Sequence, residues 1–203
     1  LKIIIENYPK NKEESFDVAY YKQDKTREES RPLPFGREIY IERGDFMEEP
    51  VKGYNRLAPE VEVRLMNAYY IACTGVVKDA AGRIVELRAV YDPATRGGQS
   101  PDNRKVKGTI QWVSAEHAIP AEVRLYEPLF TKPYPEENDE NFLDNLNPNS
   151  LTVVDALLEP SLATAQPGDK FQFVRDGYFC VDPDTTAERL VFNRTVSLRD
   201  SWK

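Results

Sequence analysis

The chain consists of short runs of β-branched and aromatic residues, each ended by Gly, Pro, Asn or Asp. Its 203 residues include 15 prolines, which leave little room for long helices. Short strands separated by turns favour an all-β fold of small barrels over a βαβ sheet. We expect strands near residues 61–71, 84–91, 106–113, 122–125, 152–157, 170–174 and 190–198.

Local patterns predict how individual strands and turns form. In REIYIER, residues 37–43, Ile39 and Ile41 alternate with polar neighbours, so one face of this strand should be buried. Residues 78–83 and 175–177 are expected to be hairpin turns in which glycine supplies the positive φ. Two weak helix candidates are residues 45–50 and 137–146.

Composition excludes several classes of protein. No apolar run reaches the roughly 18 residues of a membrane span, and the first residues do not resemble a signal peptide. Cys73 and Cys180 lie far apart without metal-ligand spacing, so we expect buried thiols of an intracellular protein. The net charge of −7 argues against non-specific nucleic-acid binding.

Charge is distributed unevenly along the chain. Residues 1–110 carry 19 Lys and Arg against 18 Asp and Glu, whereas residues 111–203 carry 8 against 16. The structureless stretch 93–105 is expected to separate the two parts. We therefore expect two small β-barrels in series, residues 1–110 and 111–203, and the second could share strands with the N-terminal segment. A start at Leu1 without methionine indicates a fragment of a longer protein.

The sequence offers little catalytic chemistry. It has no glycine-rich phosphate-binding motif, and a single histidine, His117, excludes a two-histidine metal motif. A Ser–His arrangement could use Ser114, but strand alternation should turn Ser114 and Glu116 away from His117. We expect His117 to be structural and the chain to hold no catalytic residue, metal or cofactor.

Arginines interleaved with aromatic and amide residues are the most distinctive feature. GYNRLAPEVEVRLMNAYYI, residues 53–71, contains Arg56 before a turn and Arg64 on a strand that leads to Asn67. Alternation would place Arg64 and Asn67 on opposite faces of that strand. KFQFVRDGYFC, residues 170–180, contains a second such group. Planar guanidinium and amide groups hydrogen-bond to base edges, and aromatic rings stack on bases, so these segments hold the groups that unstacked RNA bases need. The simpler alternative is that the arginines form a solvated face and the aromatic residues form the core of a barrel.

Four segments resemble the C-terminal anticodon-binding region of bacterial-type glutaminyl-tRNA synthetases, which are class I aminoacyl-tRNA synthetases. They are GREIYIERGDFMEEP, VRLMNAYYI, KVKGTIQWVSAEHAIPAEVRLYEPLF and the pair GYFCVDP with VFNRTVSLRDSW. The resemblance implies two β-barrels with the anticodon of glutamine tRNA bound at their junction. It also implies a cytoplasmic glutamine–tRNA ligase whose catalytic domain, the user of ATP, lies upstream of Leu1.

The resemblance also implies roles for individual residues. Arg56 matches an arginine that reads the third anticodon base, and Tyr54 lies in the same loop. Arg64 matches one that engages the first nucleotide, while Gln172 and Arg175 match residues that hold the central uridine. Strict alternation would make Gln172 and Arg175 face opposite ways unless the strand twists or bulges at the turn. The expected anticodon-binding set therefore consists of Tyr54, Arg56, Arg64, Asn67, Gln172 and Arg175.

The sequence departs from the usual pattern at Gly53, Asn55, Met66 and Val174, and residues 22–31 lack the usual Asn-His-Pro-like run. Contacts to the first and third bases could therefore differ. Two alternatives stay open: the similar region of an archaeal or eukaryotic glutamyl-tRNA synthetase, and a protein-interaction barrel that binds no RNA. The anticodon of the tRNA that binds distinguishes the first alternative from a glutaminyl-tRNA synthetase. The second alternative predicts no salt-sensitive affinity for RNA.

Overall fold

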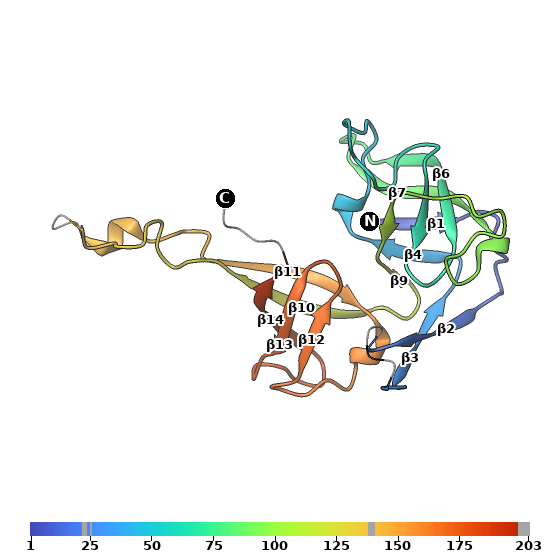
Figure 1. Ribbon diagram of the computed structural model, residues 1–203. Helices are drawn as coiled ribbons and strands as arrows, with labels where there is room; N and C mark the ends of the chain where they lie inside the picture. Colours follow the sequence, from blue (N-terminus) through green and yellow to red (C-terminus); the bar gives the residue numbers. More distant parts are fainter. Residues whose placement is uncertain (22–23, 25, 138–140, 199–203) are drawn as a thin grey trace. The chain divides into compact units, whose positions relative to one another are not determined.

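A computed structural model describes residues 1–203 except 22–23, 25, 138–140 and 199–203. The described chain is built of strands and short 3₁₀ turns, so the all-β prediction is confirmed (Figure 1). It divides into two compact units. The first comprises Leu1–Ala118 and Glu159–Ser161, and the second comprises Ile119–Leu158 and Leu162–Lys203.

The first unit contains a seven-stranded sheet in the order β8-β5-β6-β7-β1-β4-β9 and a separate two-stranded sheet, β2-β3. The strands are β1 (Lys2–Ile5), β2 (Glu14–Ala19), β3 (Ser30–Phe35), β4 (Glu38–Ile41), β5 (Glu62–Leu65), β6 (Tyr70–Lys78), β7 (Ile84–Asp92), β8 (Thr109–Ile110) and β9 (Trp112–Ser114). Two 3₁₀ turns join them, η1 (Arg43–Asp45) and η2 (Pro93–Thr95).

The large sheet is nearly closed into a barrel. Its two edge strands, β8 and β9, are separated in sequence only by Gln111, so the chain itself joins the two edges. Pairing of β1 with both β4 and β7 completes the centre of the sheet. Closure removes most of the free edge that an open sheet would expose.

Aromatic side chains fill the core of the first unit. Phe35 lies edge-on to Trp112 and to Tyr8, with ring centroids 5.0 and 5.2 Å apart. Such edge-to-face pairs suit the ring quadrupoles. Ile39 and Ile41 on β4 are buried, as the alternation in this segment predicts.

The second unit is a five-stranded sheet in the order β11-β10-β14-β13-β12. Its strands are β10 (Ile119–Tyr126), β11 (Leu151–Leu158), β12 (Lys170–Phe173), β13 (Gly177–Val181) and β14 (Leu190–Ser197), with the turn η4 (Phe142–Asn145). The turn η5 (Pro160–Leu162) is divided between the units, because Glu159–Ser161 belong to the first. Phe173 stacks on Phe179 at 4.2 Å between centroids, and Phe192 is fully buried beside Phe173.

The segment 61–71 was expected to be one strand and is instead a hairpin. β5 ends at Leu65 and β6 begins at Tyr70, with Asn67 in the left-handed region at φ 63°. Asparagine tolerates this conformation better than most residues. Alternation therefore stops at Leu65, and the predicted opposition of Arg64 and Asn67 across one strand is wrong.

The stretch 93–105 does not separate the units. Thr95 is fully buried, and its hydroxyl accepts a hydrogen bond from the backbone of Tyr70 at 2.8 Å. β8 and β9 then continue the first sheet, so the division falls after Ala118 and not after residue 110. In the described residues, every strand of the second sheet comes after Ala118.

Neither helix candidate forms an α-helix in the described residues. Residues 45–50 only overlap the end of η1, because Phe46 is extended and bridges to Leu57. Residues 137–146 contain the short turn η4, while 138–140 lie outside the described residues.

Candidate nucleic-acid interface

The loop that carries Tyr54 and Arg56 is fixed against η1. The Tyr54 hydroxyl donates to the carbonyl of Gly44 at 3.1 Å, and Arg56 Nε donates to Asp45 Oδ1 at 3.1 Å. Asp45 is buried, whereas 34% of the Arg56 side chain is exposed. A buried carboxylate therefore orients a guanidinium whose outer edge still reaches solvent.

Gly108 packs this loop against β5. A Cβ at Gly108 would lie 2.5 Å from the carbonyl oxygen of Asn55 and 3.1 Å from Val63. The carbonyl of Gly108 also accepts from the backbone N–H of Arg64 at 2.9 Å. The loop with Arg56 and the strand with Arg64 are thus brought together through one glycine.

Arg64 is held in a tight position. Its Nη2 donates to the Tyr70 hydroxyl at 3.0 Å, and its guanidinium carbon lies 5.3 Å from the centre of the Tyr70 ring. A Cβ at Gly98, which has φ +79°, would lie 3.1 Å from Arg64 Cδ. Arg64 Nε is buried without a hydrogen-bond partner among the described residues. A ligand that reaches this donor would be favoured, because an unmade buried hydrogen bond is costly.

Arg104 is a residue that our sequence reasoning missed. It lies over the same Tyr70 ring at 5.3 Å and donates to both Glu62 oxygens at 2.9 Å and to Asp92. The hydrogen bonds that Arg104 donates to Glu62 and then to Asp92 raise the pKa of its guanidinium. These bonds fold the loop after η2 beside Arg64. No local pattern signals a pairing between residues so far apart in sequence.

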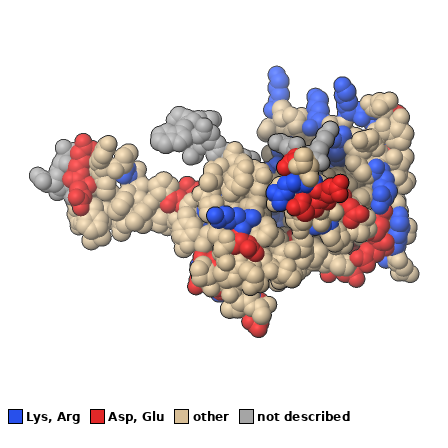
Figure 2. All heavy atoms as spheres, turned by 60° about the horizontal axis from the view of Figure 1, so that its bottom comes forward, with Lys and Arg blue, Asp and Glu red and all other residues tan. Residues whose placement is uncertain are grey.

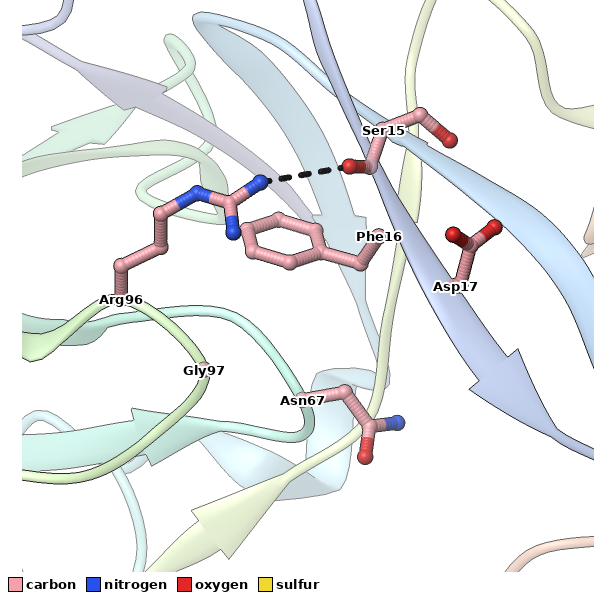
Figure 3. A pocket seen from close by; sticks show the side chains of 6 residues that line it. All are labelled: Ser15, Phe16, Asp17, Asn67, Arg96 and Gly97. Atoms are coloured by element: carbon pink, nitrogen blue, oxygen red, sulfur yellow. Dashed lines mark hydrogen bonds between the residues drawn. The ribbon is translucent and has the colours of Figure 1, made fainter.

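Asn67 lies at the β5–β6 turn and lines an open pocket of about 420 Å³. The other lining residues are Ser15, Phe16, Asp17, Arg96 and Gly97 (Figure 3). Arg96 donates through Nε to Glu14 Oε2 at 3.0 Å, and its guanidinium lies 4.7 Å from the centre of the Phe16 ring. The sequence signal that could have drawn attention to it is an arginine directly before two glycines.

Glu14 links this pocket to the core, because it accepts hydrogen bonds from Arg96 and from two buried tyrosines. Burial alone would raise its pKa, but hydrogen bonds from Tyr69, Tyr8 and Arg96 outweigh burial and hold the pKa of Glu14 below its ordinary value. The pKa values of both tyrosines are raised, first by burial and then by their bonds to Glu14. Glu14 is therefore an ionised acceptor shared by the core and the pocket.

In the second unit, Gln172 and Arg175 lie at the β12–β13 hairpin. Gln172 is exposed and pairs with Tyr178, while Phe173 faces the core. Arg175 lies in the turn at φ 77°, so strand alternation no longer governs its direction. The turn was expected, but Arg175 as well as Gly177 adopts positive φ. β12 and β13 pair in regular register up to this turn, and the register shift lies after it, between Tyr178 and Phe179 in the pairing of β13 with β14.

His117 makes a three-residue contact that was not expected. Its Nδ1 lies 3.2 Å from Ser114 Oγ, and its Nε2 lies 2.9 Å from Glu13 Oε1. The predicted divergence of Ser114 and His117 is wrong, because β9 ends at Ser114 and the backbone N–H of Ala118 bonds back to its carbonyl. Ser114 is only 3% exposed, so little of its side chain reaches solvent.

Cys73 and Cys180 are both free thiols; Cys73 is buried as expected, whereas Cys180 is only half-buried. Among the described residues, no group of three His, Cys, Asp or Glu could hold a metal ion. The helices in that part of the chain are too short or too polar to cross a membrane.

Lys and Arg project from the upper edge of the first unit, with Asp and Glu interspersed on the same face (Figure 2). Such mixed charge favours selective over non-specific RNA contact.

Two family models match the chain. Both are described as anti-codon binding domains of class I tRNA synthetases (E and Q), and they match residues 1–92 and 109–182. The chain is 52% identical to a glutamine–tRNA ligase of Nitrobacter hamburgensis, 50% to one of Clostridium kluyveri and 54% to one of Pseudomonas putida. Each match covers 100% of this chain but only 36–37% of the relative. The chain belongs to the family of anticodon-binding domains of the class I tRNA synthetases (E and Q).

Proposed function

We propose that this chain is the anticodon-recognition region of a cytoplasmic glutamine–tRNA ligase. It binds the anticodon of glutamine tRNA, and a catalytic domain of the same polypeptide uses ATP to charge that tRNA with glutamine. The observation that carries this proposal is identity of about 50% to glutamine–tRNA ligases along the whole chain. Glutamine tRNA is therefore favoured over glutamate tRNA as the partner.

In the first unit, the arrangement of Arg56 and Arg64 supports base recognition. Each guanidinium is oriented by another side chain, Asp45 for Arg56 and Tyr70 for Arg64. Preorganised guanidinium groups lose less entropy on binding than free ones. We assign Arg56, with Tyr54 beside it, to the third anticodon base and Arg64 to the first nucleotide.

In the second unit, we assign Gln172 and Arg175 to the central uridine. Gln172 is exposed beside the turn that displays Arg175. An amide offers both a donor and an acceptor to the base edge, and a guanidinium adds donors for a carbonyl or phosphate oxygen. A site built this way rejects the wrong base because its polar groups would be left unpaired.

The test is binding of this chain to glutamine tRNA and to three tRNAs with one anticodon base changed each. We expect each change to weaken binding by about 1–3 kcal/mol. Glutamate tRNA should bind more weakly than glutamine tRNA. Equal affinity for all of these tRNAs would refute anticodon recognition, and no salt-sensitive RNA binding at all would favour a protein-interaction role.

A further inference from the structure

Neither Arg56 nor Arg64 is among the residues that line the pocket at Asn67 and Arg96, although Gly98, next to the lining residue Gly97, packs against the Arg64 side chain. It is formed by β2, by the β5–β6 turn and by the loop after η2. Its volume of about 420 Å³ lies within the roughly 300–1,000 Å³ that is usual for ligand pockets. It is open to solvent.

Arg96 forms a planar cationic platform at one side of this pocket. One face of its guanidinium lies against the Phe16 ring at 4.7 Å. Its Nε is fixed by Glu14 at 3.0 Å and its Nη2 by the carbonyl of Ser15 at 3.4 Å (Figure 3). Because 56% of the side chain is still exposed, a second planar group can stack on it.

Hydrogen-bonding groups lie on the other side of the pocket. Asp17 points outward from β2, because Phe16 and Val18 on either side of it are buried. Asn67 is set by its left-handed turn, and Figure 3 shows its amide and the Asp17 carboxylate away from Arg96. Gly97, at φ +81°, has no side chain to narrow the opening.

These features fit a nucleobase better than a phosphate. The positive charge of Arg96 is already paired with Glu14, and Asp17 adds a negative charge, so the pocket does not attract a second anion. A flat base that stacks on a guanidinium and presents an edge to an amide and a carboxylate matches every wall.

We propose that this pocket binds one unstacked base of the anticodon loop, which extends the anticodon site; the inference rests on the proposed tRNA-binding function. The base stacks on Arg96, and its edge faces Asn67 and Asp17. A carboxylate only accepts hydrogen bonds, so the pocket prefers a base with an exocyclic amino group.

The experiment is a set of glutamine tRNAs in which one nucleotide at a time of the anticodon loop lacks its base. Dissociation constants are measured for the unmodified chain, Arg96→Lys and the control Arg83→Lys. Arg96→Lys keeps the charge beside Glu14 but removes the planar platform. Arg83 suits the control because it pairs with Asp79 on an exposed turn and has a side chain 80% exposed.

At one position, loss of the base should weaken binding to the unmodified chain by about 5- to 150-fold. Arg96→Lys should show little further loss with that same tRNA, because the two changes remove one contact. Arg83→Lys should bind every tRNA as the unmodified chain does. Additive losses at every position, or no loss with Arg96→Lys, would overturn the inference.

A second variant tests the edge contact. With each of the four bases placed at the identified position, Asp17→Asn should reduce the preference for amino-bearing bases; an unchanged preference would contradict the role of Asp17.

The four free nucleoside 5′-monophosphates are tested separately. Tight binding of one that tRNA does not displace would assign the pocket to a free nucleotide. If the unmodified chain ignores the anticodon altogether, the proposed function fails, and this outcome is distinct from failure of the pocket alone.

Discussion

Replacement of Glu14 by glutamine should destabilise the first unit and disturb the pocket together. Glu14 Oε1 accepts from the hydroxyls of Tyr8 at 2.9 Å and Tyr69 at 2.7 Å, while Oε2 accepts from Arg96. Its side chain is 13% exposed, and both tyrosines are buried. Glutamine keeps the shape but removes the charge, and its NH₂ group would face the Arg96 guanidinium.

The cost follows from these three bonds. Hydrogen bonds to a charged group contribute about 1.5–3 kcal/mol each and neutral ones about 1 kcal/mol, so the two tyrosine bonds weaken by roughly 1–4 kcal/mol together. Arg96 is largely exposed, so its ion pair adds less than about 1 kcal/mol. We expect a loss of about 1–5 kcal/mol at pH 7, with Tm lowered by roughly 4 °C for each kcal/mol in a unit of this size.

The stability that Glu14 contributes should depend on pH, and its lowered pKa gives the direction of that dependence. Because the pKa of Glu14 is lowered in the folded chain, its charge stabilises the fold above the ordinary value of 4.5. That contribution is lost as the pH falls through the lowered pKa. The stability gap between the unmodified chain and Glu14→Gln should therefore narrow at acid pH.

Thermal and urea unfolding at pH 7 and near pH 3 measure this gap. Glu29→Gln is the matched control, since Glu29 bonds to Arg27 on the surface with 56% of its side chain exposed. The control should melt close to the unmodified chain. If Glu14→Gln melts like the control at pH 7, or if its deficit is unchanged at low pH, the assigned role of Glu14 is refuted.

Three further predictions follow from the site. The chain alone should show no ATP–pyrophosphate exchange with glutamine and tRNA, and measurable exchange would contradict the absence of a catalytic motif. His117→Gln should cost about 1 kcal/mol of stability and leave tRNA affinity within about threefold; a large affinity loss at unchanged Tm would make His117 functional. Gly108→Ala should cost about 1–3 kcal/mol and weaken tRNA binding, because its Cβ would lie 2.5 Å from the Asn55 carbonyl and displace the Arg56 loop; unchanged binding would show that this packing does not position Arg56.

Local patterns predicted much of the fold because strands and hairpins are encoded by near neighbours. The alternation at Ile39 and Ile41 and the turn at residues 78–83 were both found. The parallel pairings of β1 with β7 and of β10 with β14 were not predicted, because they join segments far apart in sequence. No periodicity within a strand specifies its distant neighbour.

The candidate site shows the same division. Arg56 and Arg64 could be proposed from the sequence because the resemblance implies a role for each position, and Arg64 stands within the resembling segment VRLMNAYYI. The pocket at Asn67 and Arg96 could not, because it depends on a left-handed turn and on a loop folded by Arg104. Strand reasoning failed at Asn67 and at Ser114, in both cases because a turn begins where alternation was assumed to continue.

Arg175 allows stability and function to be separated at one residue. It holds φ 77°, a conformation that costs a residue with a Cβ about 1–2 kcal/mol. Arg175→Gly removes that strain, but it also frees the unfolded chain and removes the contacts of the half-buried Arg175 side chain, so we expect stability to change by no more than about 1 kcal/mol. Arg175→Asn serves as the control, because asparagine tolerates the backbone without supplying a guanidinium.

If Arg175 reads the central base, both variants should lose tRNA affinity and also lose discrimination between the cognate tRNA and a central-base mutant. Titration of both tRNAs at two salt concentrations measures this. Equal loss for the two tRNAs with a smaller salt dependence would mean that Arg175 contacts only the phosphate backbone, and our assignment to the base would be wrong.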